Sequence, residues 1–123
     1  MITLVLPLAL KSLNQRQRMH WAALMRYRNQ IALEVTAAFG GTRYFPRPPL
    51  KNVRISVCRH SQLPIDPDNL AASCKSLLDV LCVKSNRHPC GLGIIEDDNP
   101  DQCKLVTSQA RGKPTTTIII ECL

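Results

Sequence analysis

The chain has 123 residues, of which 45% are hydrophobic and 20% are charged; this suits one folded domain and excludes a disordered chain. Aromatic residues make up only 4%, so the core must consist mainly of aliphatic side chains. The net charge of +7 is uneven, because residues 1–60 carry +9 and residues 61–123 carry −2. This division favours a phosphate-binding surface beside a cation-binding site, with an uneven solvent-facing surface as the alternative.

The six cysteines are spread along the chain without a CxxC pair, and several lie inside apolar runs. Such cysteines are typical of reduced core residues in a cytoplasmic protein rather than of a secreted disulfide scaffold. The apolar segment 1–10 lacks the basic start and the small-residue cleavage site of a signal peptide. No run approaches the roughly 18 apolar residues that a membrane span needs, so we expect no membrane partner.

The first half of the chain predicts a strand and a long helix. Alternating apolar residues indicate a strand over residues 2–6, and a basic loop is expected over residues 7–17. A helix is expected from about Met19 to Phe39, ended by Gly40-Gly41 and followed by a proline-containing loop over residues 42–49. The apolar side of this helix, and therefore the core, is expected to contain Trp21, Leu24, Ile31, Val35 and Phe39.

A second strand is expected over residues 52–60, with one apolar face and one polar or basic face. The apolar face is expected to consist of Val53, Ile55 and Val57. The other face is expected to present Arg54, Ser56, Cys58 and Arg59. On that face the two arginines are candidate phosphate contacts.

The second half predicts a helix from about Pro67 to Val83, a short strand or strand-like segment at Ile94-Ile95, and two strands over residues 102–110 and 115–122. Apart from the short segment, the order is β-α-β-α-β-β. It predicts a single α+β domain over residues 1–123, with a mixed β-sheet, two main helices, and the helices packed on one face of the sheet.

The aspartates at the start of the second helix have a purely structural interpretation. Asp66 before Pro67 is a favourable helix N-cap, and Asp68 in the first turn interacts well with the helix dipole. In a continuous helix, however, residues advance by about 100° each, so Asp68, Lys75 and Asp79 would form one charged stripe. The rest of that helix is mainly apolar, which favours a functional role for the stripe.

Hydrolysis of a phosphodiester needs an activated water and a neutralised phosphate, and carboxylate-bound magnesium supplies both. Asp66 and Asp68 offer two carboxylates at a strand-to-helix junction, and Asp97-Asp98 on a later segment could complete the set of ligands. Lys75 could then neutralise the phosphate in the transition state.

Together these residues resemble a known family, the RusA family of Holliday junction resolvases, which is common in phages and prophages. The matching residues are Asp66-x-Asp68-Asn69-Leu70, Lys75, Leu78-Asp79-x-Leu81, Gly93-Ile94-Ile95 and Asp97-Asp98, with Leu13-Asn14 and Met19-His20-Trp21 near the N-terminus. The chain departs from the pattern of some members in three places. Lys75 follows Asp68 by seven residues rather than four, the loop 84–92 is long, and Ile65 replaces a basic residue.

The resemblance implies a homodimeric endonuclease that cuts four-way DNA junctions symmetrically with Mg²⁺, or with Mn²⁺ as a substitute. Asp66, Asp68 and Asp98 would be the metal ligands, with Asp97 as a further candidate, and Lys75 would be the catalytic lysine. Such a protein is expected in the cytoplasm of a bacterial cell or a phage-infected host, where it acts in DNA recombination and repair. The alternative hypothesis is a non-catalytic, basic DNA-binding or phage assembly protein whose aspartates only cap a helix.

Two further sets of residues have candidate roles. Arg16, Arg18 and His20, at the end of the first loop, join Arg54 and Arg59 as candidate DNA contacts. The residues Cys82, His88, Cys90 and Cys103 could be imagined as a zinc site, but their spacings match no common zinc pattern, which favours reduced cysteines and a loop histidine.

Overall fold

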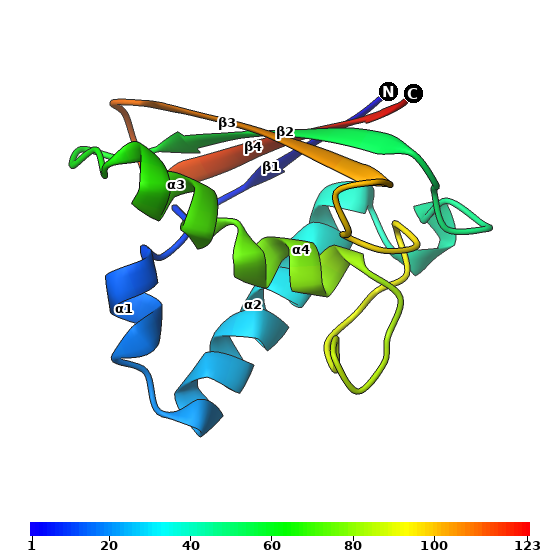
Figure 1. Ribbon diagram of the computed structural model, residues 1–123, viewed down its shortest axis with the longest axis horizontal. Helices are drawn as coiled ribbons and strands as arrows, with labels where there is room; N and C mark the ends of the chain where they lie inside the picture. The colour runs from blue at the N-terminus through cyan, green and yellow to red at the C-terminus, as the bar shows by residue number, and fades with distance from the viewer.

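A four-stranded mixed sheet carries the helices α1 to α4 on one of its faces in the computed structural model, which describes residues 1–123 (Figure 1). The strands are β1 (Ile2–Leu6), β2 (Val53–His60), β3 (Cys103–Ala110) and β4 (Thr115–Cys122). The helices are α1 (Leu13–Gln17), α2 (Trp21–Phe39), the short 3-10 helix η1 (Thr42–Tyr44), α3 (Pro67–Ser73) and α4 (Lys75–Leu81). The predicted α+β class, with a mixed sheet and helices on one face, is confirmed.

The strands lie in the order β1-β4-β2-β3, with β4 antiparallel to both of its neighbours and β2 parallel to β3. Because β2 and β3 are parallel, the chain between them must return along the whole length of the sheet. The helices α3 and α4 make this return across the helical face (Figure 1). The start of α3 therefore lies at the carboxyl end of β2, whereas the segment before β3 lies at the opposite end of the strands.

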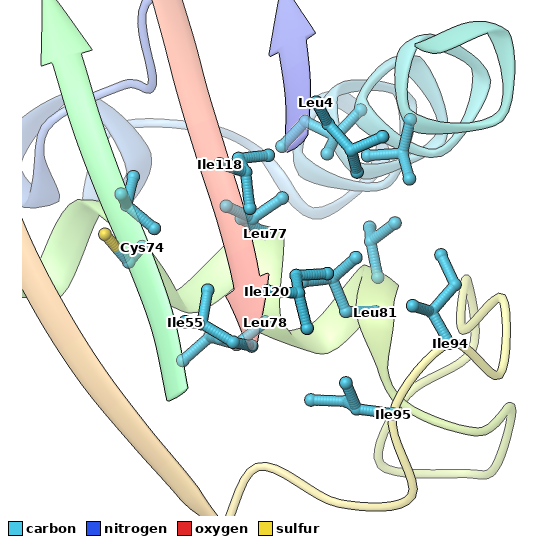
Figure 2. Close-up of a cluster of buried hydrophobic side chains, with 14 of the residues drawn as sticks. Leu4, Ile55, Cys74, Leu77, Leu78, Leu81, Ile94, Ile95, Ile118 and Ile120 are labelled. Carbon is cyan, nitrogen blue, oxygen red and sulfur yellow. The ribbon is translucent and has the colours of Figure 1, made fainter. Parts of the chain in front are cut away.

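The core forms where α4 packs against the sheet. Figure 2 shows the leucines of this helix directed toward the central strands, with two residues of the later loop beside them. The fully buried aliphatic members of this group are Leu77, Leu81, Ile55, Ile118, Ile120, Ile94 and Ile95. Burying such a side chain contributes about 1.5–3 kcal/mol. Since α4 is surrounded by protein, its polar residues Ser76 and Asp79 are buried as well.

The expected helix from Pro67 to Val83 is wrong in its continuity: α3 and α4 are separate helices that meet at Cys74, and α4 ends at Leu81. Cys74 has the backbone angles φ −79° and ψ −9°, and it serves as the C-cap of α3 and the N-cap of α4. The guanidinium of Arg16 donates a hydrogen bond to the backbone carbonyl of Ala72 next to the break. That arginine therefore satisfies a carbonyl that an unbroken helix would have used itself.

Two expectations about the N-terminal half are also wrong. The expected basic loop contains α1, because Ser12 and Gln15 form a reciprocal capping box. Trp21, expected in the core, is 72% exposed because it is the first residue of α2, where no other element covers it. Tyr27 is buried instead, and its hydroxyl accepts a hydrogen bond from the backbone N–H of Lys11 at 2.9 Å.

Arg59 does not lie on the polar face of β2. Side chains alternate along a strand, so Arg59 shares the inner face with Val57 and is only 7% exposed. Its Nε donates to the carbonyl of Leu10 at 2.8 Å, which ties β2 to the segment after β1. Arg54 does lie on the outer face and is exposed, as expected.

The remaining expectations concern the state of the cysteines and the presence of a membrane-spanning helix. All six cysteines are unpaired: Cys74, Cys82 and Cys103 are buried, Cys58 and Cys90 are half-buried, and Cys122 is exposed. No helix combines the length and the apolar composition needed to cross a membrane.

Replacing Arg59 should destabilise the fold, whereas replacing Arg54 on the same strand should not. Arg59→Met removes a charged donor and leaves the Leu10 carbonyl unpaired, which costs about 1.5–3 kcal/mol. Arg54→Met should change the free energy of unfolding by less than about 0.5 kcal/mol. Urea denaturation gives the free energy of unfolding of both variants. A loss in Arg59→Met as small as that in Arg54→Met would show that the bond to Leu10 contributes nothing.

Candidate metal centre

The predicted site aspartates fall into two groups that the fold keeps apart. Asp66 and Asp68 begin α3 at the carboxyl end of β2, and Asp97-Asp98 precede β3 at the other end of the parallel strand pair. An eight-residue strand spans roughly 23 Å between its first and last residues. The family resemblance implied that the two pairs lie together at one metal ion. In this structure they lie apart.

Asp66 acts as a helix cap in this structure. Its Oδ1 accepts a hydrogen bond from the backbone N–H of Asn69 at 2.9 Å, and its Oδ2 accepts one from the Asn69 side-chain amide at 2.7 Å. Asp68 lies in the first turn of α3 with an exposed side chain. The segment before them is held by Gln109 of β3, whose side-chain amide accepts from and donates to the backbone of Ile65 at 3.0 and 2.6 Å.

Lys75, Asp79 and Asp98 do meet. The Lys75 ammonium lies 3.0 Å from Oδ1 of Asp79, one turn along α4, and 3.3 Å from Oδ2 of Asp98. The Lys75 side chain is 51% exposed, while that of Asp98 is only 11% exposed. Burial alone would lower the pKa of Lys75, but the hydrogen bonds and charges of the two carboxylates outweigh this effect and raise it. The amine therefore stays a cation at neutral pH.

Asp79 is the most buried carboxylate of this region, with a side chain that is 5% exposed. Besides Lys75, its oxygens lie 3.1 Å from a guanidinium nitrogen of Arg28 on α2 and 3.2 Å from Nδ1 of His88. The contact with Asp79 gives the Arg28 side chain, which is only 19% exposed, its partner in the interior. A carboxylate so deeply buried needs such partners, because an unpaired buried charge is strongly destabilising.

Four potential metal ligands gather beside this network. Their ligand atoms all lie within 4.8 Å of one another, and the residues are Cys82, His88, Asp97 and Asp98. Cys82 caps the end of α4, His88 belongs to the following loop, and the aspartates precede β3. A cluster of this kind can hold a metal ion.

The loop that carries His88 is closely hydrogen-bonded. Ser85 and His88 exchange backbone hydrogen bonds of 3.1 Å each, and Gly91 donates to the carbonyl of His88 at 3.0 Å. Gly91 lies so close to α4 that a Cβ atom there would come within 2.4 Å of the Cys82 carbonyl oxygen. Since only glycine permits this approach, the loop is held against the end of α4 and fixes the position of His88.

The protonation of the cluster follows from its surroundings. Burial raises the pKa of the Cys82 thiol to about 12, and the charges of Asp98, Asp97 and Asp79 add to the effect. The pKa of Asp97 is lowered, because its carboxylate accepts hydrogen bonds from the Asn99 side chain and the Asp98 backbone. Without a metal, the centre thus holds a neutral thiol beside an ionised Asp97.

The rejected zinc interpretation had contained part of this cluster. Cys82 and His88 do come together, but their partners are Asp97 and Asp98 rather than Cys90 and Cys103. Their spacing along the chain follows no recurring pattern because a folded loop, not a short turn, joins them. The one available signal was the unusual length of the loop that contains His88.

The candidate DNA contacts divide into structural and exposed residues. Arg59 and Arg16 are used internally, and burial is the main reason that the pKa of Arg16 is lowered. His20 is the N-cap of α2, with its Nδ1 accepting from the backbone of Ala22 at 3.4 Å. Arg18 and Arg54 have exposed side chains that remain available to a phosphate.

Comparison of the chain with protein-family models, with curated proteins and with solved structures finds no match. The site must therefore be interpreted from its own geometry.

The buried Asp79 network should contribute far more to stability than a surface ion pair does. Asp79→Asn leaves Arg28 and Lys75 without their shared buried anion, which should cost about 3–5 kcal/mol. Glu96→Gln, which breaks only the exposed pair with Lys51, should cost less than about 1 kcal/mol. Urea denaturation of the two variants gives the comparison, and a small effect of Asp79→Asn would contradict the importance assigned to the network.

Proposed function

We propose that this chain is a metal-dependent endonuclease that cleaves branched DNA, with Asp98 and Lys75 at the reacting phosphate. The observation that carries the proposal is the half-exposed Lys75 ammonium, held 3.3 Å from Asp98 beside a group of potential metal ligands. A fixed cation next to a metal-binding carboxylate is the combination that phosphodiester hydrolysis requires. The family resemblance of the sequence supports the same reaction.

The residues present fit a magnesium ion in part. Asp97 and Asp98 provide oxygen ligands, and magnesium commonly uses one or two carboxylates and completes its shell with water. When bound there, Mg²⁺, or Mn²⁺ in its place, would lower the pKa of a water molecule and neutralise charge on the phosphate. Asp98 would hold this ion, and Asp97 would orient Asp98 by accepting its backbone N–H at 2.9 Å.

Lys75 would act on the phosphate itself. Its ammonium keeps its proton, because Asp79 and Asp98 raise its pKa, and it can therefore neutralise an oxygen that gains negative charge during the reaction. Asp79 would position this amine by its contact of 3.0 Å, while Arg28 balances the remaining charge of Asp79. If Asp98 held a metal ion, its charge would be neutralised there, and the half-exposed Lys75 would be available to a phosphate oxygen.

The substrate proposal rests on charge and on the family resemblance. The basic helices α1 and α2 lie in the same layer as α3 and α4 (Figure 1), and exposed basic residues such as Arg18 could contact a DNA backbone. A four-way junction is the substrate that the resemblance implies. Since symmetric resolution needs two cuts, the proposal includes a homodimer with two sites.

The roles of Asp66 and Asp68 define the second candidate function. The resemblance would make them metal ligands, whereas the Asp66 carboxylate caps α3 through its two contacts with Asn69. This capping geometry favours the alternative in which the chain is a basic DNA-binding or phage assembly protein without catalysis. A substitution that preserves the N-cap at position 66 but removes its charge can distinguish the nuclease from the non-catalytic protein.

The proposed reaction predicts metal-dependent, structure-selective cleavage. A labelled four-way junction should be cut at paired positions with Mg²⁺ or Mn²⁺, while a matched linear duplex remains intact. A chelator should abolish cleavage and added Mg²⁺ should restore it. Tight junction binding without cleavage in either metal would instead support the non-catalytic alternative.

Substitution of the site carboxylates should separate chemistry from helix capping. Asp98→Asn should reduce junction cleavage by at least about 100-fold without preventing DNA binding. Asp66→Asn preserves a helix N-cap and should retain cleavage within about threefold of the unsubstituted protein if capping is its role. Loss of cleavage in Asp66→Asn would assign the metal to α3, and full activity of Asp98→Asn would overturn the proposed site.

A further inference from the structure

We infer that Cys82, His88, Asp98 and Asp97 form a binding site for a transition-metal ion of the zinc class. The four ligand atoms lie within 4.8 Å of one another and come from three separate segments. In a tetrahedral zinc site, neighbouring ligand atoms are about 3.3–3.7 Å apart, given metal–ligand bonds of about 2.0–2.3 Å. The donors therefore need to close by only about an ångström to surround one ion.

His88 supplies the strongest independent indication of a ligand. Its side chain is 7% exposed, yet neither ring nitrogen has a hydrogen-bond partner of acceptable geometry. Buried imidazole nitrogens are rarely left in this state, because each loses its hydrogen bonds to water. Nε2 lies 3.9 Å from Oδ1 of Asp98, so a shared ion between them would satisfy both groups.

Asp79 completes an arrangement that is common around metal-bound histidines. A histidine that binds a metal through one nitrogen usually presents the other to a carboxylate, which orients the ring. Here Nδ1 of His88 lies 3.2 Å from Oδ1 of Asp79, which is an ion-pair distance without hydrogen-bond geometry, and Nε2 lies 3.9 Å from Oδ1 of Asp98. The buried Asp79 would thus be a positioning residue for the metal-binding imidazole.

The donor set selects the class of metal. A thiolate and an imidazole suit zinc and cobalt, whereas magnesium binds oxygen and gains nothing from sulfur. Cys82 is fully buried beside the ion, and binding would displace its thiol proton to the solvent, leaving a thiolate bound to the metal. Two carboxylates and one thiolate with a neutral imidazole would give a divalent cation a strongly favourable set of charges.

The metal inference does not depend on the nuclease proposal, although the two share Asp97 and Asp98. A zinc-class ion at this centre could serve the structure alone, by joining the end of α4 to the loop and to the start of β3. Magnesium-dependent cleavage and thiolate-bound cobalt are separate measurements, so either proposal can fail while the other stands.

The inference is tested by titrating the full-length, metal-free protein with Co²⁺ and recording its absorption spectrum. We expect about one equivalent of cobalt per chain, a near-ultraviolet thiolate-to-cobalt band, and the strong visible bands of a tetrahedral ion. An excess of Mg²⁺ should leave these bands unchanged, and one equivalent of Zn²⁺ should remove them. Absence of the thiolate band at saturating cobalt in the unsubstituted protein would overturn the inference.

Two fully buried cysteines at the ends of α4 provide a matched control. Cys82→Ala should abolish the thiolate band, whereas Cys74→Ala should retain it. His88→Ala should weaken cobalt binding by at least about 10-fold, and Asp79→Asn should weaken it by about 10-fold through loss of ring orientation. Retention of the band in Cys82→Ala would place the metal at another cysteine and refute the site.

Discussion

A single buried carboxylate, that of Asp79, links the helices α2 and α4 to the loop that carries His88. It lies on the core helix α4 and contacts a cation from α2, a cation from its own helix and an imidazole from the later loop. Each contact fixes a group on which the candidate site depends: Arg28 aligns the two helices, Lys75 turns toward Asp98, and His88 is drawn into the interior. Without these partners a charge so deeply buried would be too costly to retain.

The topology of the sheet then decides which acidic residues can act together. Parallel pairing of β2 and β3 sends the chain back along the helical face, so the carboxylates that follow β2 lie far from those that precede β3. Of the site residues predicted on α3 and α4, only Lys75 reaches the second pair. The chemistry that we propose is therefore concentrated beside α4, where the Asp98 carboxylate lies close to the Lys75 ammonium and to the unpaired ring nitrogens of His88.

Local patterns in the sequence were sufficient for the fold class, the four strands, the cap at Gly40 and the helix start at Asp66, because all depend on neighbours along the chain. They failed where tertiary contacts decide. The helix break at Cys74 carries no glycine or proline, and the loop that brings His88 to Cys82 has no spacing rule. Arg59 is a different case, since strict alternation from Val57 already places it inside.

The break at Cys74 also affects how α3 and α4 are oriented relative to each other. In a continuous helix, one added residue rotates everything that follows by about 100°, so Asp68 and Lys75 would be locked in phase. A junction between two short helices removes that lock, because α4 is oriented by its own leucines in the core and α3 by its contacts to α1 and β3. The relative orientation of Asp68 and Lys75 is therefore set by the tertiary contacts of the two helices and not by the periodicity of one helix.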